Sequence, residues 1–237
     1  MQNLTRRSFV STATVGLAAL GATAAIPTEA KAQLVWKTDE WKLAEFEKLV
    51  HYPARIKQVY DVTQIADGKF LNNVKNSLNG LRFGFNVPEH QIKIAAALHG
   101  PTNMLNYDDF IWEKYEIGAW LKVIDPATEK PATRNPFYKS TLTSKTDALS
   151  ALNDKNSVYQ DTSIETLQVR GVQFLSCHTA TEEQGRVLIK RNNWSKNPEE
   201  VAHEMLAHTV PGVLVVASMV AAVALLQAEG HYTYITL

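Results

Sequence analysis

Residues 171–178 have the sequence Gly-Val-Gln-Phe-Leu-Ser-Cys-His, an apolar run that ends at the single cysteine of the chain, Cys177. A second run, Ile-Lys-Ile-Ala-Ala-Ala-Leu at residues 92–98, stops at His99, Gly100 and Pro101. Short apolar runs bounded by turn-forming residues are typical of buried strands. Segments with helical periodicity separate such runs. This alternation favours a single α/β domain with a mainly parallel sheet.

Working outward from these two strands, we find helical periodicity in most of the remaining chain. We predict helices over residues 39–50 (with Asp39 as N-cap), 68–81, 107–121, 163–169, 181–193, 198–207 and 210–229. Residues 55–62 and 231–237 alternate in the manner of strands. Residues 123–163 contain three prolines and many short polar side chains, which is typical of an irregular insertion. We therefore expect one domain, residues 33–237, with an insertion at about 123–163.

The first 32 residues have the organisation of an export signal. Arg6 and Arg7 precede Ser8 and a mildly apolar run, and Ala30-Lys31-Ala32 supplies small residues two apart. A charged start, an apolar middle and an A-x-A end define a secretory signal, and paired arginines are typical of the twin-arginine (Tat) pathway. A membrane anchor is the alternative, but about 20 apolar residues are needed to span a bilayer. We expect a signal peptide at residues 1–32 and a periplasmic protein.

Composition excludes several classes of function. The 237 residues carry 24 Lys and Arg against 24 Asp and Glu. Binding to nucleic acid needs a basic excess that replaces counterions on phosphates, so we expect no nucleic-acid partner. One cysteine allows neither an intramolecular disulfide nor a cysteine-rich zinc site. The sequence has no P-loop, dinucleotide fingerprint or nucleophile elbow, and we expect no cofactor.

Cys177 is the leading candidate for catalysis. The carboxyl ends of the strands in a parallel α/β sheet border the ligand crevice. A thiol at such an end, just before a helix, lies near backbone N–H groups whose partial positive charge favours the nucleophilic thiolate. We therefore expect an accessible Cys177 with a depressed pKa. The alternative is a buried, inert side chain, because free cysteines are among the most buried residues.

Two histidines flank the same predicted edge of the sheet. His99 ends one strand, and His178 follows Cys177 at the end of another. If these strands are neighbours, an imidazolium could stabilise the thiolate, or the three side chains could bind a soft metal. The alternative is that each histidine hydrogen-bonds locally. His203 and His208 lie five residues apart, which does not fit the metalloprotease motif, and we expect no metal site.

Three ordered segments together resemble the DsrE/DsrF-like sulfur-relay family. They are residues 94–100 (IAAALHG), residues 171–185 (GVQFLSCHTATEEQG), and the closing pair 210–213 (VPGV) and 225–235 (LLQAEGHYTYI). The resemblance covers residues 82–237 and implies a Rossmann-like layered fold that assembles as a trimer or hexamer. It implies that Cys177 carries sulfur as a persulfide. His99, Gly100 and His178 are then the candidates for substrate binding.

The principal hypothesis is an exported sulfurtransferase or sulfur carrier, with a donor and an acceptor that the sequence does not name. A non-enzymatic oligomer of the same fold, which binds a ligand, metal or partner, is the alternative, and a structural oligomer is the third. Residues 209–228 carry no formal charge. Pro211 and Gly212 interrupt this run and no Lys or Arg flanks it, so we expect a buried helix and no membrane span in the mature chain.

Overall fold

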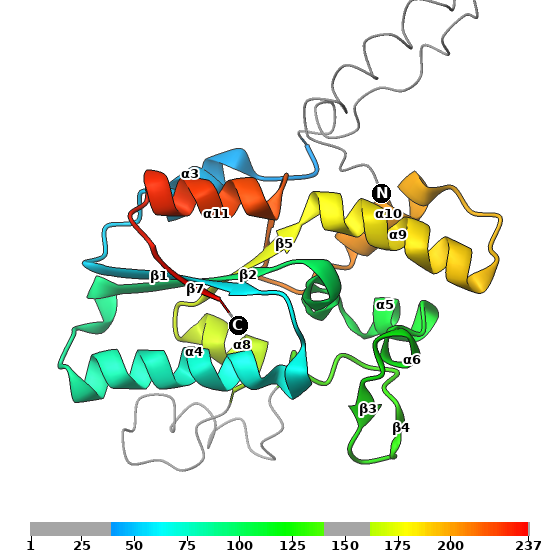
Figure 1. Cartoon of the computed structure of the whole chain (residues 1–237), viewed down its shortest axis with the longest axis horizontal. Helices are drawn as coiled ribbons and strands as arrows, with labels where there is room; N and C mark the ends of the chain where they lie inside the picture. The colour runs from blue at the N-terminus through cyan, green and yellow to red at the C-terminus, as the bar shows by residue number, and fades with distance from the viewer. Residues whose placement is uncertain (1–38, 140–161, 237) are drawn as a thin grey trace, which may run out of the picture. The chain divides into compact units, whose positions relative to one another are not determined.

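A five-stranded parallel sheet lies at the centre of the computed structural model, which describes residues 39–139 and 162–236 (Figure 1). Its strands occur in the order β6-β5-β2-β1-β7, and every neighbouring pair is parallel. Their bounds are β1 (Ile56–Val62), β2 (Ile92–Leu98), β5 (Gln173–Cys177), β6 (Leu214–Val216) and β7 (Thr233–Thr236). The predicted α/β class, a Rossmann-like layered domain with a mainly parallel sheet, is confirmed. The predicted signal peptide lies outside the described residues, as do residues 140–161 of the predicted insertion.

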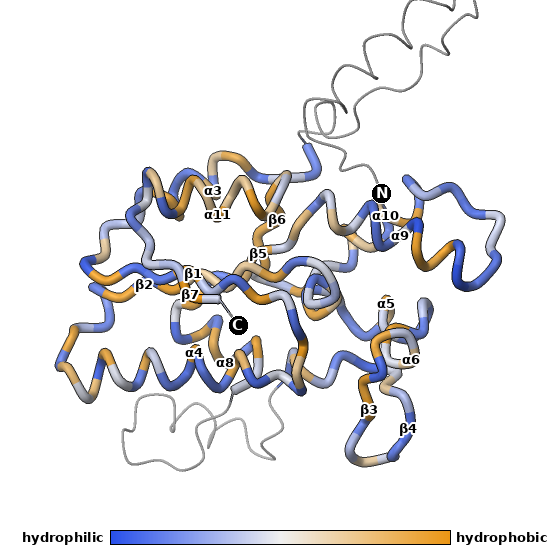
Figure 2. The backbone as a smooth tube through the Cα atoms, viewed as in Figure 1, coloured by the Kyte–Doolittle hydropathy of each residue, from blue (hydrophilic) through white to orange (hydrophobic). Residues whose placement is uncertain are grey.

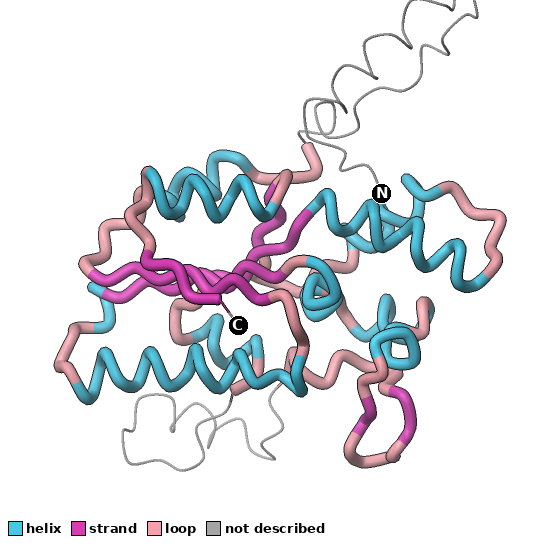
Figure 3. Tube along the Cα trace, in the orientation of Figure 1, coloured by secondary structure: helices cyan, strands magenta, loops and turns pink. Residues whose placement is uncertain are grey.

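Helices cover both faces of this sheet (Figures 1 and 3). On one face lie α3 (Leu43–Val50) and α11 (Met219–Ala228), and on the other lie α4 (Lys69–Asn79) and α8 (Ile164–Val169). The remaining helices are α5 (Asp109–Lys114), α6 (Ile117–Leu121), α9 (His178–Asn192) and α10 (Pro198–Ala207). Shorter turns of helix occupy Ala66–Gly68, Gly80–Gly84, Glu89–Gln91 and Gly100–Asn106. Helix α9 continues directly from β5, which places Cys177 at the junction between strand and helix.

The alternation of side chains along each strand divides the core into two parts. Ala96 of β2 and Phe174 of β5 belong to a large cluster under α4 and α8. Ala95 of β2, Leu175 of β5 and Cys177 belong to a smaller cluster under α3 and α11. Figure 2 shows that β6 and α11 are largely hydrophobic along their length. The thiol therefore faces the α3/α11 side of the sheet.

The predicted long helix over residues 210–229 is wrong. The run divides into the edge strand β6 and the helix α11, because Gly212 turns the chain with φ 80° after Pro211. The N–H of Val210 donates to the carbonyl of Asn106 at 2.8 Å, which holds this turn away from a helical path. The β-branched residues that follow favour a strand and pair with β5. None of the helices within residues 39–139 and 162–236 is long and apolar enough to cross a membrane.

Other predicted elements also have different bounds in the structure, and helix α9, for example, begins at His178 and not at residue 181. Helix α3 begins at Leu43 and not at Asp39, because the residues before it make contacts with α9 instead. The predicted helix over 107–121 divides into α5 and α6 at Glu116, which adopts the left-handed conformation with φ 50°. The described part of the predicted insertion contains a small hairpin of β3 (Ile124–Asp125) and β4 (Lys130–Pro131).

The predicted starts of the helices over residues 163–169 and 198–207 agree with the structure. The side chain of Ser163 accepts the N–H of Thr166 at 3.1 Å and so caps α8. Asp108 accepts the N–H of Ile111 at 3.3 Å and caps α5. Helix α10 begins at Pro198 as expected.

Candidate functional site

The sulfur of Cys177 lies where the first turns of two helices meet. Its Sγ accepts the N–H of Ala180, in the first turn of α9, at 3.4 Å. It also accepts the N–H of Met219, the first residue of α11, at 3.3 Å. Free N–H groups at a helix start carry partial positive charge, which stabilises an anion. The arrangement is therefore suited to hold a negative charge on the sulfur.

The expectation of an accessible Cys177 with a depressed pKa is wrong for this structure. The residue is only 6% exposed, because Phe46 of α3 and Ala222 of α11 pack in the same cluster. Burial raises the pKa of the thiol, and the N–H groups of Ala180 and Met219 oppose this effect without overcoming it. The thiol at rest is neutral and shielded, so any chemistry at Cys177 requires part of this cover to move.

A buried polar network, which the sequence analysis did not identify, fixes the backbone at Cys177. Asn103 accepts the N–H of Cys177 at 2.9 Å and the hydroxyl of Ser176 at 3.0 Å through Oδ1. Its amide group donates to Thr181 Oγ1 at 3.1 Å and to Gln184 Oε1 at 3.2 Å. All of these residues are buried. The side-chain amide of Asn103 thus hydrogen-bonds to both the end of β5 and the start of α9. These bonds keep the strand–helix junction in a single conformation.

Tyr107 also belongs to this polar network. Its hydroxyl lies 2.5 Å from Thr181 Oγ1, and the side chain is completely buried. Burial raises the pKa of Tyr107 to about 12. The sequence signal for the network was the polar group that follows strand β2, namely Thr102, Asn103 and Asn106. Polar residues after a strand usually indicate a loop, so this signal alone did not predict burial.

His178, the first residue of α9, is held by the segment that precedes α3. Its side chain is 0% exposed, and Nε2 makes a short hydrogen bond to a carboxylate oxygen of Glu40. The other carboxylate oxygen of Glu40 lies 3.5 Å from His203 Nδ1. The ring of Trp41 meets the His178 ring edge-on, with 5.2 Å between centroids. Residues 39–42, which we call the strap, are therefore fastened over the residue next to Cys177.

His99 has a different environment. Its Nε2 lies 2.5 Å from Asp61 Oδ1, and Asp61 Oδ2 accepts the hydroxyl of Tyr234 at 2.5 Å. Asp61 belongs to β1 and Tyr234 to β7, so His99 is engaged on the side of β2 that is remote from β5. Within the described segments, no hydrogen bond joins His99 to Cys177 or His178. Both histidines thus hydrogen-bond to carboxylates from other parts of the chain, His99 to Asp61 and His178 to Glu40.

Gly100 is connected to Cys177, although indirectly. It begins the 3₁₀ helix Gly100–Asn106 with φ 58°, a left-handed value that favours glycine. Its carbonyl accepts the amide of Gln184, whose Oε1 accepts from Asn103. Gly100 therefore helps to order the loop that carries Asn103, and through Asn103 it supports the backbone of Cys177.

An apolar groove of about 130 Å³ lies between α3, β6 and α11, on the same face as the thiol. Phe46, Val216 and Ala222 line the groove and also pack in the cluster that contains Cys177. Val216 is the register partner of Cys177 across the β5–β6 pair. The groove therefore borders the apolar cluster in which the sulfur lies.

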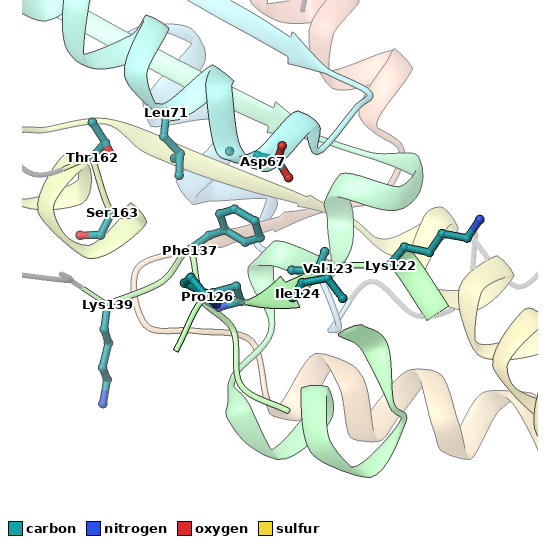
Figure 4. Close-up of a pocket in the computed structure, with 12 residues that line it drawn as sticks. Asp67, Leu71, Lys122, Val123, Ile124, Pro126, Phe137, Lys139, Thr162 and Ser163 are labelled. Atoms are coloured by element: carbon teal, nitrogen blue, oxygen red, sulfur yellow. The ribbon is translucent and has the colours of Figure 1, made fainter. Parts of the chain in front are cut away.

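A larger cavity, of about 430 Å³, lies at the start of α4 (Figure 4). Leu71 and Phe137 point into it, whereas the ammonium group of Lys139 points away. Its described lining ends at Lys139 and Thr162, next to residues that the structure does not describe. None of the predicted site residues lines this cavity, so it is separate from the site at Cys177.

The chemistry of the site rests on the thiol and its hydrogen-bond donors. In the part of the chain that the structure describes, no group of three or more His, Cys, Asp or Glu side chains could hold a metal ion. The site residues are a buried thiol with two backbone N–H donors on its sulfur and a backbone that Asn103 holds. No protein-family model matches the chain, and no curated protein or solved structure is significantly similar to it.

Proposed function

We propose that this protein carries sulfane sulfur as a persulfide on Cys177 and passes it to another thiol. The observation that carries the proposal is the convergence of the Ala180 and Met219 N–H groups on Sγ. Hydrogen bonds to an ionised acceptor are stronger than those to a neutral one, so these donors favour the thiolate and the persulfide anion. The resemblance of residues 82–237 to the DsrE/DsrF-like family supports the same role for the cysteine.

The loading step exchanges one sulfur–sulfur bond for another. The Cys177 sulfur attacks the terminal sulfur of a polysulfide, and a new S–S bond forms as the terminal bond of the chain breaks. The thiol proton passes to the departing polysulfide, which is shorter by one sulfur atom. No external oxidant or reductant is needed. Delivery to an acceptor thiol is the same exchange, with Cys177 as the leaving group.

The setting of this chemistry is part of the proposal. Arg6 and Arg7 and the A-x-A pattern ending at Ala32 support Tat export to the periplasm. A homo-oligomer, a trimer or hexamer, is supported by the uncharged helix α11, where Val220 is 70% and Leu225 is 40% exposed. Sedimentation of the mature protein tests the assembly, and a monomer over the whole concentration range would contradict it.

The burial of Cys177 favours a second candidate function from another class. A cysteine that is 6% exposed and has a raised pKa is typical of a structural side chain. In that case the protein is a non-enzymatic module that binds a ligand, a metal or a partner. This candidate differs from the carrier in one measurable respect, because its folded form acquires no sulfur.

Intact-mass spectrometry after exposure to inorganic polysulfide separates the two candidates. The carrier gains about 32 Da, the mass of one sulfur atom, and dithiothreitol removes the adduct. Peptide mapping places it on Cys177, and a Cys177→Ser variant, which has a similar shape, shows none. A urea-denatured sample is the control for intrinsic thiol reactivity. If only the denatured protein gains sulfur, the carrier proposal is wrong and the binding module is favoured.

A further inference from the structure

We infer that the groove between α3, β6 and α11 binds a short anionic polysulfide and presents it to Cys177. This inference rests on the proposed carrier function and names the class of its donor. The alternative donor is a protein-bound persulfide, which would have to bring its own cysteine to the thiol.

The position of the groove relative to the sulfur is the first argument. The groove is lined by residues 215–218, which end β6 and lead into α11. The next residue, Met219, donates its N–H to Cys177 Sγ at 3.3 Å. A chain molecule that lies along residues 215–218 therefore has one end at the start of α11, beside the sulfur. Phe46, Val216 and Ala222 line the groove and belong to the same apolar cluster as Cys177.

The size of the groove is the second argument. Its volume of about 130 Å³ is well above the roughly 10–15 Å³ that one buried water needs on the same measure. The groove therefore has room for a small molecule such as a chain of a few sulfur atoms. Trp41, Phe46 and Leu225 supply aromatic and aliphatic surface. Divalent sulfur is polarisable and packs well against such surface.

Charge is the third argument. Among the described residues that line the groove, Lys42 has the one ionised side chain and none is a carboxylate. The nearest acid along the strap, Glu40, is engaged by His178 and His203. A polysulfide carries its negative charge at its ends, so one end is attracted to Lys42 and the other to the N–H groups at the start of α11.

The test measures the rate at which Cys177 gains sulfur from inorganic polysulfide in the mature protein. Ala221 is exposed and lines the groove, whereas Ala224 is exposed on the same helix outside the lining. We expect Ala221→Trp to slow loading by about tenfold or more. The indole would displace the polysulfide from the position in which its terminal sulfur can react with Cys177. Ala224→Trp is the matched control and leaves the rate unchanged. Circular dichroism and sedimentation confirm that both variants retain fold and mass.

A second pair of variants tests the charge without altering the core. Lys42→Glu reverses the charge at the groove, and Lys48→Glu makes the same change on the exposed side of α3. We expect Lys42→Glu to slow loading by polysulfide by about tenfold, in line with electrostatic attraction of a charged ligand. Alkylation by neutral iodoacetamide stays the same in both variants.

The outcomes separate the two proposals. If wild-type Cys177 gains no sulfur, the carrier function itself fails. If Cys177 is loaded but the Ala221→Trp and Lys42→Glu variants match their controls, the groove is not the donor site while the carrier function stands. Faster loading by a protein persulfide than by polysulfide at equal concentration would also overturn the inference.

Discussion

The two faces of the central sheet are built from the same strands and yet are filled differently. On the α4/α8 face, large side chains such as Phe174 and Trp112 are completely buried. On the α3/α11 face, the strands present Ala95 and Ala97 together with larger residues such as Leu175, and the single thiol, Cys177. Close packing stabilises both faces, but among the pockets of the described residues an apolar groove lies only beside the helices of the α3/α11 face. The two faces of one sheet therefore differ in the side chains that they bury and in the space that they leave.

Truncation of a phenylalanine on each face is the strongest test of this comparison. Phe174 on the α4/α8 face is 0% exposed. Phe46 on the α3/α11 face is 6% exposed and lines the groove. We expect Phe174→Ala to lower the free energy of unfolding by about 3–5 kcal/mol, and Phe46→Ala by about half as much, because the cost depends on how well the site collapses. Urea unfolding measures both. Equal losses would mean that the two faces contribute equally to the core.

Much of this architecture follows from local sequence patterns. The apolar runs at residues 92–98 and 173–177 predict strands because each is short and ends at turn-forming residues. The helix predicted over residues 163–169 agrees with the structure because the Ser163 cap acts on an N–H group only a few residues away. The run 209–228 was misassigned because its apolar composition suits a buried strand and a buried helix equally, and the turn at Gly212 decides between them.

The environment of Cys177 was harder to predict than its position. The sequence placed the thiol at the end of a strand and the start of a helix, and the structure confirms this placement. Its burial depends on Phe46 and Ala222, which come from distant parts of the chain. The bonds from Asn103 to Cys177 and Thr181 likewise join residues more than 70 positions apart. Patterns of local periodicity carry no information about such contacts.

A prediction of intermediate size concerns Tyr107. This residue packs in the cluster under α4 and α8, and its hydroxyl joins the polar network around Asn103 that holds the backbone of Cys177. Burial raises its pKa from 10.0 to about 12, so the neutral phenol is favoured in the folded state. The corresponding stability is fully present below pH 10 and is lost as the pH rises through 12. It amounts to about 2–3 kcal/mol. Tyr107→Phe should therefore flatten the loss of stability between pH 9 and pH 12, relative to wild type.

The measurement for Tyr107 is urea unfolding at several alkaline pH values. At neutral pH the variant loses about 1 kcal/mol with its hydrogen bond to Thr181. The thiol of Cys177 also has a raised pKa, so Cys177→Ser serves as the background for both proteins. Parallel alkaline profiles for the two proteins would show that Tyr107 ionises as readily in the folded state as in the unfolded state.

The last prediction concerns the strap, which covers the residue beside Cys177. Glu40 holds the buried His178 with one carboxylate oxygen and approaches His203 with the other. Glu40→Gln keeps the shape of the side chain but replaces a charge-assisted hydrogen bond with a neutral one, at a cost of about 1–2 kcal/mol. The strap then opens more often, while the α4/α8 face of the sheet is unaffected.

An opening that becomes easier by 1–2 kcal/mol is populated about 5–30 times more often, so alkylation of native Cys177 by iodoacetamide should accelerate by a similar factor. Glu45→Gln is the matched control, because Glu45 is exposed on α3 and pairs only with the exposed Lys48 among the described ion pairs. Such a surface pair contributes little, and the labelling rate of this variant should equal that of wild type. Equal rates for Glu40→Gln and wild type would show that the strap does not limit access. The opening step would then belong to α11, whose first N–H group is bonded to the sulfur.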